Sequence, residues 1–448
     1  MRKFLPEKLV ELSRFADFPL YVVGGSVRDF LSGQLKKNAD FDLAGYGEEE
    51  LLFRAAERAG FTIKAVYRNT GTVLLCDSDG RKYEFTRFRS DSYVRGLHTP
   101  KSITFTTEIE KDAVRRDFCA NAVYYDIARE AFVDPLGGIE DINKHILRTV
   151  APAEKVFGED GLRLMRLARL AAETGFSADE ECLQGAKRNA ELIRDIVPER
   201  IFSELSRLLL VEDGRRAYDG LILLKETGVL KEIAPELALG QNIAQRADFH
   251  KYDVLEHSLR CVKYSAKGIR FAALLHDVGK PYCFQRNGNF YGHAEEGARI
   301  AAEILTRLKA PKKLTEETQT LVLLHGKDYD LSMREYKVRK VIAENDELLP
   351  KLLLLFQADF SACKDDTSPA PVALKWQEVS MRMEKEGAPR SLKQLKVNGE
   401  DLLPLGIPHE RIGTLLNELF YYALEDGARN ERERLLKHAA NIAKRYLT

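Results

Sequence analysis

The first 150 residues mix short apolar runs with turns, which predicts strands and helices in one small domain. The run FPLYVV at 18–23 predicts a short buried strand. Two further apolar runs, TVLLC at 72–76 and KYEFTRF at 82–88, are joined by the turn sequence DSDG and predict a hairpin. This part of the chain is therefore expected to be a small α/β domain.

Beyond residue 150 the apolar positions recur with helical spacing, most clearly in LRLMRLARLAAETGF at 162–176. Helical patterns continue to the C-terminus, and histidines concentrate after residue 246. The sequence DDTSPAP at 365–371 is the best candidate for a linker. We expect an α+β protein with four parts: 1–150, 151–245, 246–365 and 366–448.

The predicted strand at 18–23 is followed directly by Gly24 and Gly25, with Ser26 as the expected N-cap of a helix over VRDFL. Glycines let an anion approach the backbone N–H groups, and a helix start adds partial positive charge there. The turn is therefore expected to bind phosphate.

Asp40 and Asp42 lie two residues apart in the sequence DFD. On a strand such residues point to the same face, about 6.5 to 7 Å apart along the backbone. Two carboxylates on one face suit two metal ions, as in-line displacement at a phosphate requires. Taken alone, the pair could equally be a solvated loop. Glu84 could be a third carboxylate or a solvated strand residue.

Composition restricts the partners and the compartment. The chain of 448 residues carries 69 Lys plus Arg and 69 Asp plus Glu, so a nucleic acid would have to meet a local basic face. The six cysteines form no CxxC pair, which argues against a zinc ribbon or a disulfide framework. No apolar run approaches the roughly 20 residues needed to cross a bilayer. We expect a cytoplasmic protein without a membrane partner.

The order of several motifs indicates a family. The motifs GGSVRD and DFD are followed by RRDFCANA at 115–122, DPLGGIED at 134–141, EDGLR at 159–163 and PERIFSEL at 198–205. This series resembles the class II tRNA nucleotidyltransferases and the bacterial poly(A) polymerases. The resemblance covers about half the chain and implies a polymerase-β-like nucleotidyltransferase head.

By position in these motifs, the resemblance implies that Asp40 and Asp42 hold Mg²⁺ and that Arg28 binds the triphosphate. It also assigns a nucleotide-binding role to Arg116, Asp117 and Asn121, whose donors and acceptors suit ribose hydroxyls and phosphate. The alternative for these three residues is a helix start with a salt bridge.

The EDGLR motif places Asp160 and Arg163 three residues apart, on one face of an expected helix. An Asp acceptor beside an Arg donor matches the pairing edges of cytosine and adenine, but not those of uracil and guanine. A simple salt bridge between the two is the alternative. Arg166 is a further nucleotide-binding candidate, although Arg163, Arg166 and Arg169 could also be a solvated basic stripe.

A second cluster resembles the H…HD…H…H…D pattern of HD-superfamily phosphohydrolases. Imidazole and carboxylate ligands in such a set suit one or two divalent ions, with Mn²⁺, Ni²⁺ or Co²⁺ as candidates. The alternative is a metal-free helical scaffold. The expected ligands are His257, His276, Asp277, His293, His325 and Asp359.

The resemblance implies a template-independent enzyme that adds or repairs the 3′-terminal CCA of tRNA from CTP and ATP, with the tRNA 3′ end as partner. The sequence at 397–436 resembles a C-terminal helical segment presumed to contact tRNA, although packing alone could explain it. Alternatives are a poly(A) polymerase, an enzyme adding only CC or only A, and an HD phosphohydrolase with an RNA-binding head. The ending KHAANIAKRYLT is only modestly basic, which favours tRNA over generic RNA.

Overall fold

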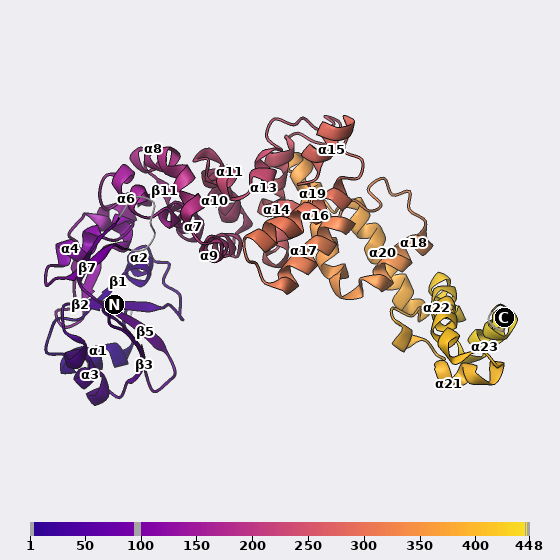
Figure 1. Ribbon diagram of the computed structural model, residues 1–448, viewed down its shortest axis with the longest axis horizontal. Helices are drawn as coiled ribbons and strands as arrows, with labels where there is room; N and C mark the ends of the chain where they lie inside the picture. The colour runs from indigo at the N-terminus through magenta and orange to yellow at the C-terminus, as the bar shows by residue number, and fades with distance from the viewer. Residues whose placement is uncertain (1–3, 94–99, 444, 446–448) are drawn as a thin grey trace. The chain divides into compact units, whose positions relative to one another are not determined.

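The computed structural model describes residues 4–93, 100–443 and 445. The last residues of the modestly basic ending lie outside this range. The described chain divides into two compact units, one up to Ala238 and one from Leu239 onward. Strands occur in the first unit, whereas the second is helical (Figure 1).

A seven-stranded sheet forms the centre of the first unit, in the order β3-β4-β5-β2-β1-β8-β9. Neighbouring strands are antiparallel except β2 and β5, which are parallel. The predicted hairpin is confirmed as β4 paired with β5. The strands are β1 (Tyr21–Val23), β2 (Phe41–Gly45), β3 (Thr62–Tyr67), β4 (Thr72–Cys76), β5 (Lys82–Arg87), β8 (Tyr124–Asp126) and β9 (Ala131–Val133).

Two small ladders accompany this sheet. Strand β6 (Arg89–Ser92) pairs antiparallel with β7 (Ser102–Phe105), and β10 (Ile146–Leu147) pairs parallel with β11 (Ser177–Ala178). The loop that joins β6 to β7 lies largely outside the described residues.

The helices of the first unit contribute buried apolar residues to its core. In α7 the recurring leucines and alanines face the core, and Gly175 ends the helix with a φ of +76°, a conformation that favours glycine. The helices are α1 (Glu7–Phe15), α2 (Gly25–Leu31), α3 (Glu49–Arg58), α4 (Ile109–Val114), α5 (Gly138–Lys144), α6 (Ala153–Glu159), α7 (Leu162–Thr174), α8 (Glu180–Asn189), α9 (Pro198–Leu209), α10 (Gly214–Glu226), α11 (Val229–Ile233) and α12 (Pro235–Ala238).

The second unit is built from helices, with residues 365–370 connecting α19 to α20. Its final helices α22 and α23 pack through a leucine-rich core that includes Leu415, Leu419 and Leu435. The helices are α13 (Val254–Tyr264), α14 (Arg270–Leu275), α15 (Lys280–Asn287), α16 (His293–Arg307), α17 (Lys312–Leu324), α18 (Glu335–Glu344), α19 (Leu349–Lys364), α20 (Pro371–Glu386), α21 (Gly399–Leu402), α22 (His409–Glu425) and α23 (Arg432–Ala443).

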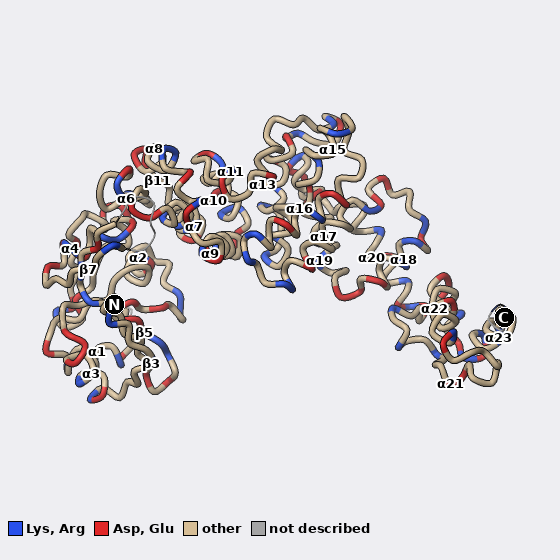
Figure 2. Tube along the Cα trace, viewed as in Figure 1, with Lys and Arg blue, Asp and Glu red and all other residues tan. Residues whose placement is uncertain are grey.

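Charge is distributed evenly along both units. Stretches of Lys or Arg and of Asp or Glu are both scattered over each unit, with uncharged residues between them (Figure 2), in agreement with the balanced composition. Across the residues described here, no helix is both long enough and apolar enough to span a membrane.

Candidate nucleotide-binding site and HD metal centre

One cavity of about 960 Å³ in the first unit collects every residue that the sequence predicts for nucleotide binding. These residues come from four separate motifs, so the fold brings distant segments together. The predicted residues that line the cavity are Gly24, Gly25, Ser26, Arg28, Asp40, Asp42, Arg116, Asp117, Asn121, Asp160, Arg163 and Arg166.

The carboxylates lie at the start of β2. Asp40 precedes the strand, and Asp42 is its second residue, exposed to the cavity. In the parallel pairing of β2 with β5, Asp42 is the register partner of Glu84. The surrounding protein desolvates Asp42, and with the negative charge of Glu84 this raises its pKa to about 6. The site thus concentrates negative charge where a divalent cation would relieve it.

The glycine turn approaches these carboxylates closely. Gly24 has a φ of +87°, and a Cβ atom built there would lie 3.3 Å from Asp42 Oδ2. The turn therefore requires glycine for its backbone conformation and leaves little room for a side chain.

The prediction that Ser26 caps the helix is wrong. Helix α2 begins at Gly25 with Gly24 as its N-cap, because the left-handed turn at Gly24 starts the helix one residue early. Ser26 lies inside the first turn, buried, and its Oγ makes no hydrogen bond to the described residues. That hydroxyl is available to a ligand in the cavity.

A chain of polar side chains crosses the cavity wall. Arg28 Nη1 donates to Asn121 Oδ1 at 2.7 Å, and Asn121 Nδ2 donates to Asp117 Oδ1 at 3.2 Å. Arg166 Nε donates to Asp117 Oδ2 at 2.8 Å. Burial would raise the pKa of Asp117, but Arg166 and these hydrogen bonds hold it well below its usual range. Asp117 therefore stays ionised and keeps the surrounding donors in place.

Arg116 is held from behind by two buried groups. Its Nη2 donates to Asp112 Oδ2 at 2.9 Å and its Nε to Tyr124 Oη at 3.0 Å. Arg116 and Asp117 follow the end of α4, so they are not a helix start, although the ion pairs that this alternative invoked are present.

The prediction that Asp160 and Arg163 share one helix face is wrong. Helix α6 ends at Glu159, and Asp160 adopts an extended conformation (φ −147°) from which its Oδ1 accepts a hydrogen bond from Leu162 N at 2.9 Å. Asp160 thus precedes α7, whereas Arg163 lies within it. Both side chains nevertheless line the same cavity.

Arg163 pairs with the neighbouring acid. Its Nη1 donates to Glu159 Oε2 and to the Val156 carbonyl, both at 3.0 Å, and its Nη2 donates to the Arg115 carbonyl at 2.8 Å. The predicted alternative, a salt bridge to Asp160, does not form. The solvated-stripe alternative is wrong as well, because Arg163 and Arg169 are buried.

The second unit gathers the predicted HD ligands around Asp277. His257 Nε2 and His276 Nε2 lie 3.5 and 3.2 Å from its Oδ2. His293 Nε2 and His325 Nε2 lie 3.6 and 3.5 Å from its Oδ1. Each oxygen of one buried carboxylate thus faces two imidazole nitrogens.

Asp359 on α19 completes one side of the cluster. Its Oδ1 lies 2.9 Å from His257 Nε2 and 3.6 Å from His276 Nε2. Three helices (α13, α16 and α19) and the residues just after the ends of α14 and α17 therefore contribute to one group of ligands. The sequence prediction of the six residues is consistent with this convergence.

Backbone carbonyls orient three of the imidazoles. The Nδ1 atoms of His276, His293 and His325 lie 2.8, 2.9 and 2.6 Å from the carbonyl oxygens of residues three positions earlier. In metal-binding histidines the same backbone contact at one ring nitrogen orients the ring and leaves the other nitrogen for the metal.

The charge balance at Asp277 fits a metal ion. Both carboxylate oxygens are buried and accept no hydrogen bond from the described residues, although Lys280 Nζ lies 2.7 Å from Oδ2. Burial would raise the pKa of Asp277, but His276 and Lys280 hold it well below its usual range. An ionised, buried carboxylate facing four imidazole Nε2 atoms suits a divalent cation, which would take the place of the protons there.

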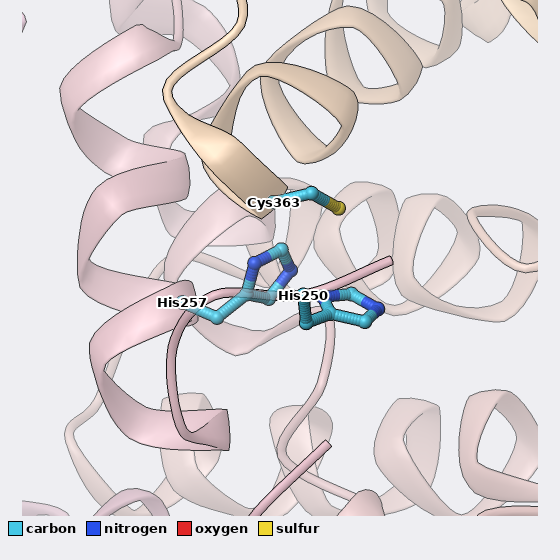
Figure 3. Close-up of side chains that lie close together, drawn as sticks. All are labelled: His250, His257 and Cys363. Atoms are coloured by element: carbon cyan, nitrogen blue, oxygen red, sulfur yellow. The ribbon is translucent and has the colours of Figure 1, made fainter. Parts of the chain in front are cut away.

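Sequence reasoning missed two residues beside this cluster, His250 and Cys363. With His257 they form a further group whose potential ligand atoms all lie within 4.8 Å of one another (Figure 3). His250 precedes the HD pattern and Cys363 follows it by four residues, so the pattern gave no signal for either.

Three segments match known protein families. Residues 20–148 match the Poly A polymerase head domain, residues 175–239 a probable RNA and SrmB-binding site of polymerase A, and residues 254–359 the HD domain. Both catalytic domain types work with divalent metal ions.

Curated relatives extend over most of the chain. The A-adding tRNA nucleotidyltransferase of Deinococcus radiodurans is 30% identical over 420 residues, covering 89% of this chain and 90% of the relative. The Multifunctional CCA protein of Chromobacterium violaceum is 31% identical over 368 residues, covering 78% of this chain and 84% of the relative.

Solved structures share the fold. The CCA-adding enzyme of Bacillus stearothermophilus in complex with CTP superposes with a TM-score of 0.70 at 24% identity, over 98% of this chain and 97% of that one. The Thermotoga maritima CCA-adding enzyme complexed with tRNA gives a TM-score of 0.61 at 18% identity, over 97% and 94%.

The sheet-based head and the helical HD unit together define a nucleotidyltransferase of the poly(A) polymerase type. The chain belongs to the family of tRNA nucleotidyltransferases that includes the A-adding and CCA-adding enzymes.

Proposed function

We propose that this tRNA nucleotidyltransferase adds the 3′-terminal CCA to tRNA, from CTP and ATP and without a nucleic-acid template. The observation that carries the proposal is the convergence of four motifs on one cavity in the first unit. The relatives named for CCA addition and the solved CCA-adding enzymes support the choice of substrates.

Asp40 and Asp42 are the proposed Mg²⁺ ligands, because Mg²⁺ prefers carboxylate oxygens and keeps contacts to substrate phosphates. When bound, Mg²⁺ would lower the pKa of the RNA 3′-hydroxyl and neutralise charge on the leaving pyrophosphate. Glu84, the register partner of Asp42, supplies a third carboxylate on the same face of the sheet.

The triphosphate is assigned to the glycine turn and to Arg28. Ser26 Oγ, buried without a partner among the described residues, can donate to a phosphate oxygen. Arg28 is fixed by Asp29 and Asn121, so its guanidinium is held in one orientation toward the cavity.

The ribose is assigned to Arg116, Asp117 and Asn121, and the base to Asp160 and Arg163. Arg166 extends the hydrogen-bonded series of the ribose group by donating to Asp117. Glu159 and two carbonyls engage three of the five N–H donors of Arg163, which leaves others for the base edge.

The test uses purified protein and tRNAs that end before the CCA, after the first C, or after CC. Each is incubated with CTP, ATP, UTP and GTP singly and together, and the products are sized on a gel. Ordered addition of C, C and A supports the proposal. Addition of A alone to the CC-ending tRNA would instead assign the activity named for the Deinococcus relative, and long A tails would assign a poly(A) polymerase.

A second candidate function belongs to the HD cluster, which we propose to be a metal-dependent phosphohydrolase. The buried carboxylate of Asp277 and the four Nε2 atoms that face its two oxygens support this proposal. Imidazole ligands favour Mn²⁺, Ni²⁺ or Co²⁺ over Mg²⁺. Metal analysis and hydrolysis of phosphomonoesters and 2′,3′-cyclic nucleotides test this. Wild-type protein that binds none of these ions and hydrolyses nothing would leave the cluster as scaffold.

A further inference from the structure

Beyond the HD cluster, one thiol and two imidazoles meet at its edge. Cys363 projects from α19, His257 from α13, and His250 from the loop before α13 (Figure 3). The three potential ligand atoms lie within 4.8 Å of one another. The rings of His250 and His257 stand edge to face, with centroids 4.9 Å apart. This separation is compatible with ligands of a single ion.

Backbone and side-chain contacts fix the loop that carries His250. The N–H of Lys251 donates to the Cys363 carbonyl at 2.9 Å. The adjacent Tyr252 donates its hydroxyl to Asp365, two residues beyond the thiol. His250 and Cys363 are therefore held next to each other by one main-chain hydrogen bond and one side-chain hydrogen bond between their neighbours.

The two imidazoles keep polar atoms without partners. Nδ1 of His257 and Nδ1 of His250 are buried and make no hydrogen bond to the described residues, and the whole His257 side chain is inaccessible. The three other histidines of the HD cluster each place Nδ1 against a backbone carbonyl. His257 differs from them, and a buried imidazole nitrogen left unpaired costs free energy unless a ligand satisfies it.

The thiol of Cys363 has only a weak partner. Its Sγ donates to the carbonyl of Asp359 at 3.4 Å, one helical turn earlier. A metal ion bound to the sulfur would therefore replace this long contact.

We propose that Cys363, His250 and His257 form a thiolate-containing metal site, distinct from the HD pattern, that binds a thiophilic divalent ion such as Zn²⁺. Thiolate and imidazole are both ligands that Zn²⁺ takes in proteins, and a zinc site with three protein ligands keeps a fourth position open. Binding forms a metal–sulfur bond, and the thiol proton leaves to solvent.

The site shares His257 with the HD cluster, which has a functional consequence. An ion held by Cys363 and His250 engages an imidazole that also faces Asp277 and Asp359. An ion at this position therefore perturbs the neighbouring metal position through the shared imidazole, and the thiolate adds a sulfur ligand that the HD cluster lacks.

The first experiment needs no variant. Of the six cysteines, all within the described residues, five are buried and Cys363 is partly exposed. Chelator-treated full-length protein should therefore show one fast-reacting thiol, and Zn²⁺ should protect it. A fast thiol that reacts equally with and without Zn²⁺ would overturn the proposal.

The second experiment titrates Co²⁺ into the metal-free protein and follows the thiolate-to-cobalt charge-transfer absorption in the near ultraviolet. The wild type should develop this band, and Cys363→Ser should lack it and bind Zn²⁺ about 10- to 100-fold more weakly, or worse. Cys261→Ala is the control, because Cys261 lies beside His276 without belonging to the proposed group. A wild type without the band, or a Cys363→Ser protein that retains it, would exclude the site.

Discussion

Asp42 and Glu84 are register partners on the parallel strands β2 and β5, although 42 residues separate them in sequence. Residues paired in this way project from the same face of a sheet, so the two carboxylates flank one position beside the glycine turn. This pairing makes the β2 edge of the cavity more negative than the DFD sequence alone indicates.

Replacing Asp42 by Ala should abolish nucleotide addition without unfolding the protein. The side chain is a proposed metal ligand exposed to the cavity and contributes nothing to the core. Because metal ions supply several kcal/mol of transition-state stabilisation, a loss of about a thousandfold or more is expected. Single-turnover addition to tRNA measures it. Asp79→Ala, on an exposed turn of the same domain, is the control and should be unaffected.

Glu84→Gln tests whether Glu84, the register partner of Asp42, takes part in metal binding. A third metal-binding carboxylate predicts a rate loss of at least about tenfold, which corresponds to about 1.4 kcal/mol. The loss should shrink as Mg²⁺ is raised, because weaker binding can be offset by concentration. An unchanged rate at every Mg²⁺ concentration would show that Glu84 is a solvated strand residue.

Asp160→Ala should relax base selection more than it slows addition of the correct base. The carboxylate is proposed to accept a hydrogen bond from the amino group of cytosine or adenine, and its loss should cost about 1 to 3 kcal/mol of discrimination. Competition between CTP and UTP measures this ratio. Asp219→Ala, on an exposed part of α10, is the matched control. Full discrimination between CTP and UTP in the Asp160 variant would show that Asp160 does not take part in base recognition.

The double change His276→Ala with Asp277→Ala should eliminate metal binding in the HD cluster and any hydrolysis of 2′,3′-cyclic substrates. Addition of nucleotides to tRNA should continue, because the proposed catalytic residues of addition all lie in the first unit. Both activities are measured on the same preparation. A variant that keeps its circular dichroism but loses both activities would contradict this separation.

Asp365→Asn should destabilise the second unit at neutral pH. The Asp365 carboxylate accepts hydrogen bonds from Tyr264 at 2.6 Å and from Arg260 at 2.8 Å. Its φ of +58° is tolerated by Asn, so the backbone should not be strained. Losing hydrogen bonds to a charged group should cost about 2 kcal/mol.

The pH dependence of this effect has a definite sign. Burial would raise the pKa of Asp365, but Tyr252, Tyr264 and Arg260 lower it far below its ordinary value. The stabilisation is therefore present above the unfolded pKa of about 3.9 and is lost as pH falls toward the folded pKa. The difference between wild type and variant should shrink below about pH 4. The difference in the free energy of unfolding is measured by urea unfolding, followed by the fluorescence of Trp376, the single tryptophan, which lies in this unit.

Local signals in the sequence predicted much of the fold and the site. The β4–β5 hairpin, the strand before Gly24 and helix α7 follow from short-range patterns of apolar residues, turn residues and glycine. These features depend on nearby residues, which a single sequence displays directly. The HD residues are spread from 257 to 359 and were identified by the resemblance of their order to a family pattern.

The errors and omissions depend on geometry that spacing does not encode. The prediction of Ser26 as the N-cap was wrong because the positive φ of Gly24 places the helix start one residue earlier. The prediction of Asp160 as a helical residue was wrong because α6 ends before it. Glu84 and Cys363 gain their neighbours only through strand pairing and helix packing across long sequence separations.

The proposed nucleotide-binding residues end at Arg166, and the HD residues begin at His257, so the two sets share no residue and no helix or strand. A mutation that damages one set therefore leaves the other chemically intact. Selection can therefore change or remove the ligands of the proposed hydrolytic centre without affecting the proposed nucleotide-adding residues of the head. A lineage that loses HD ligands need not lose the gene.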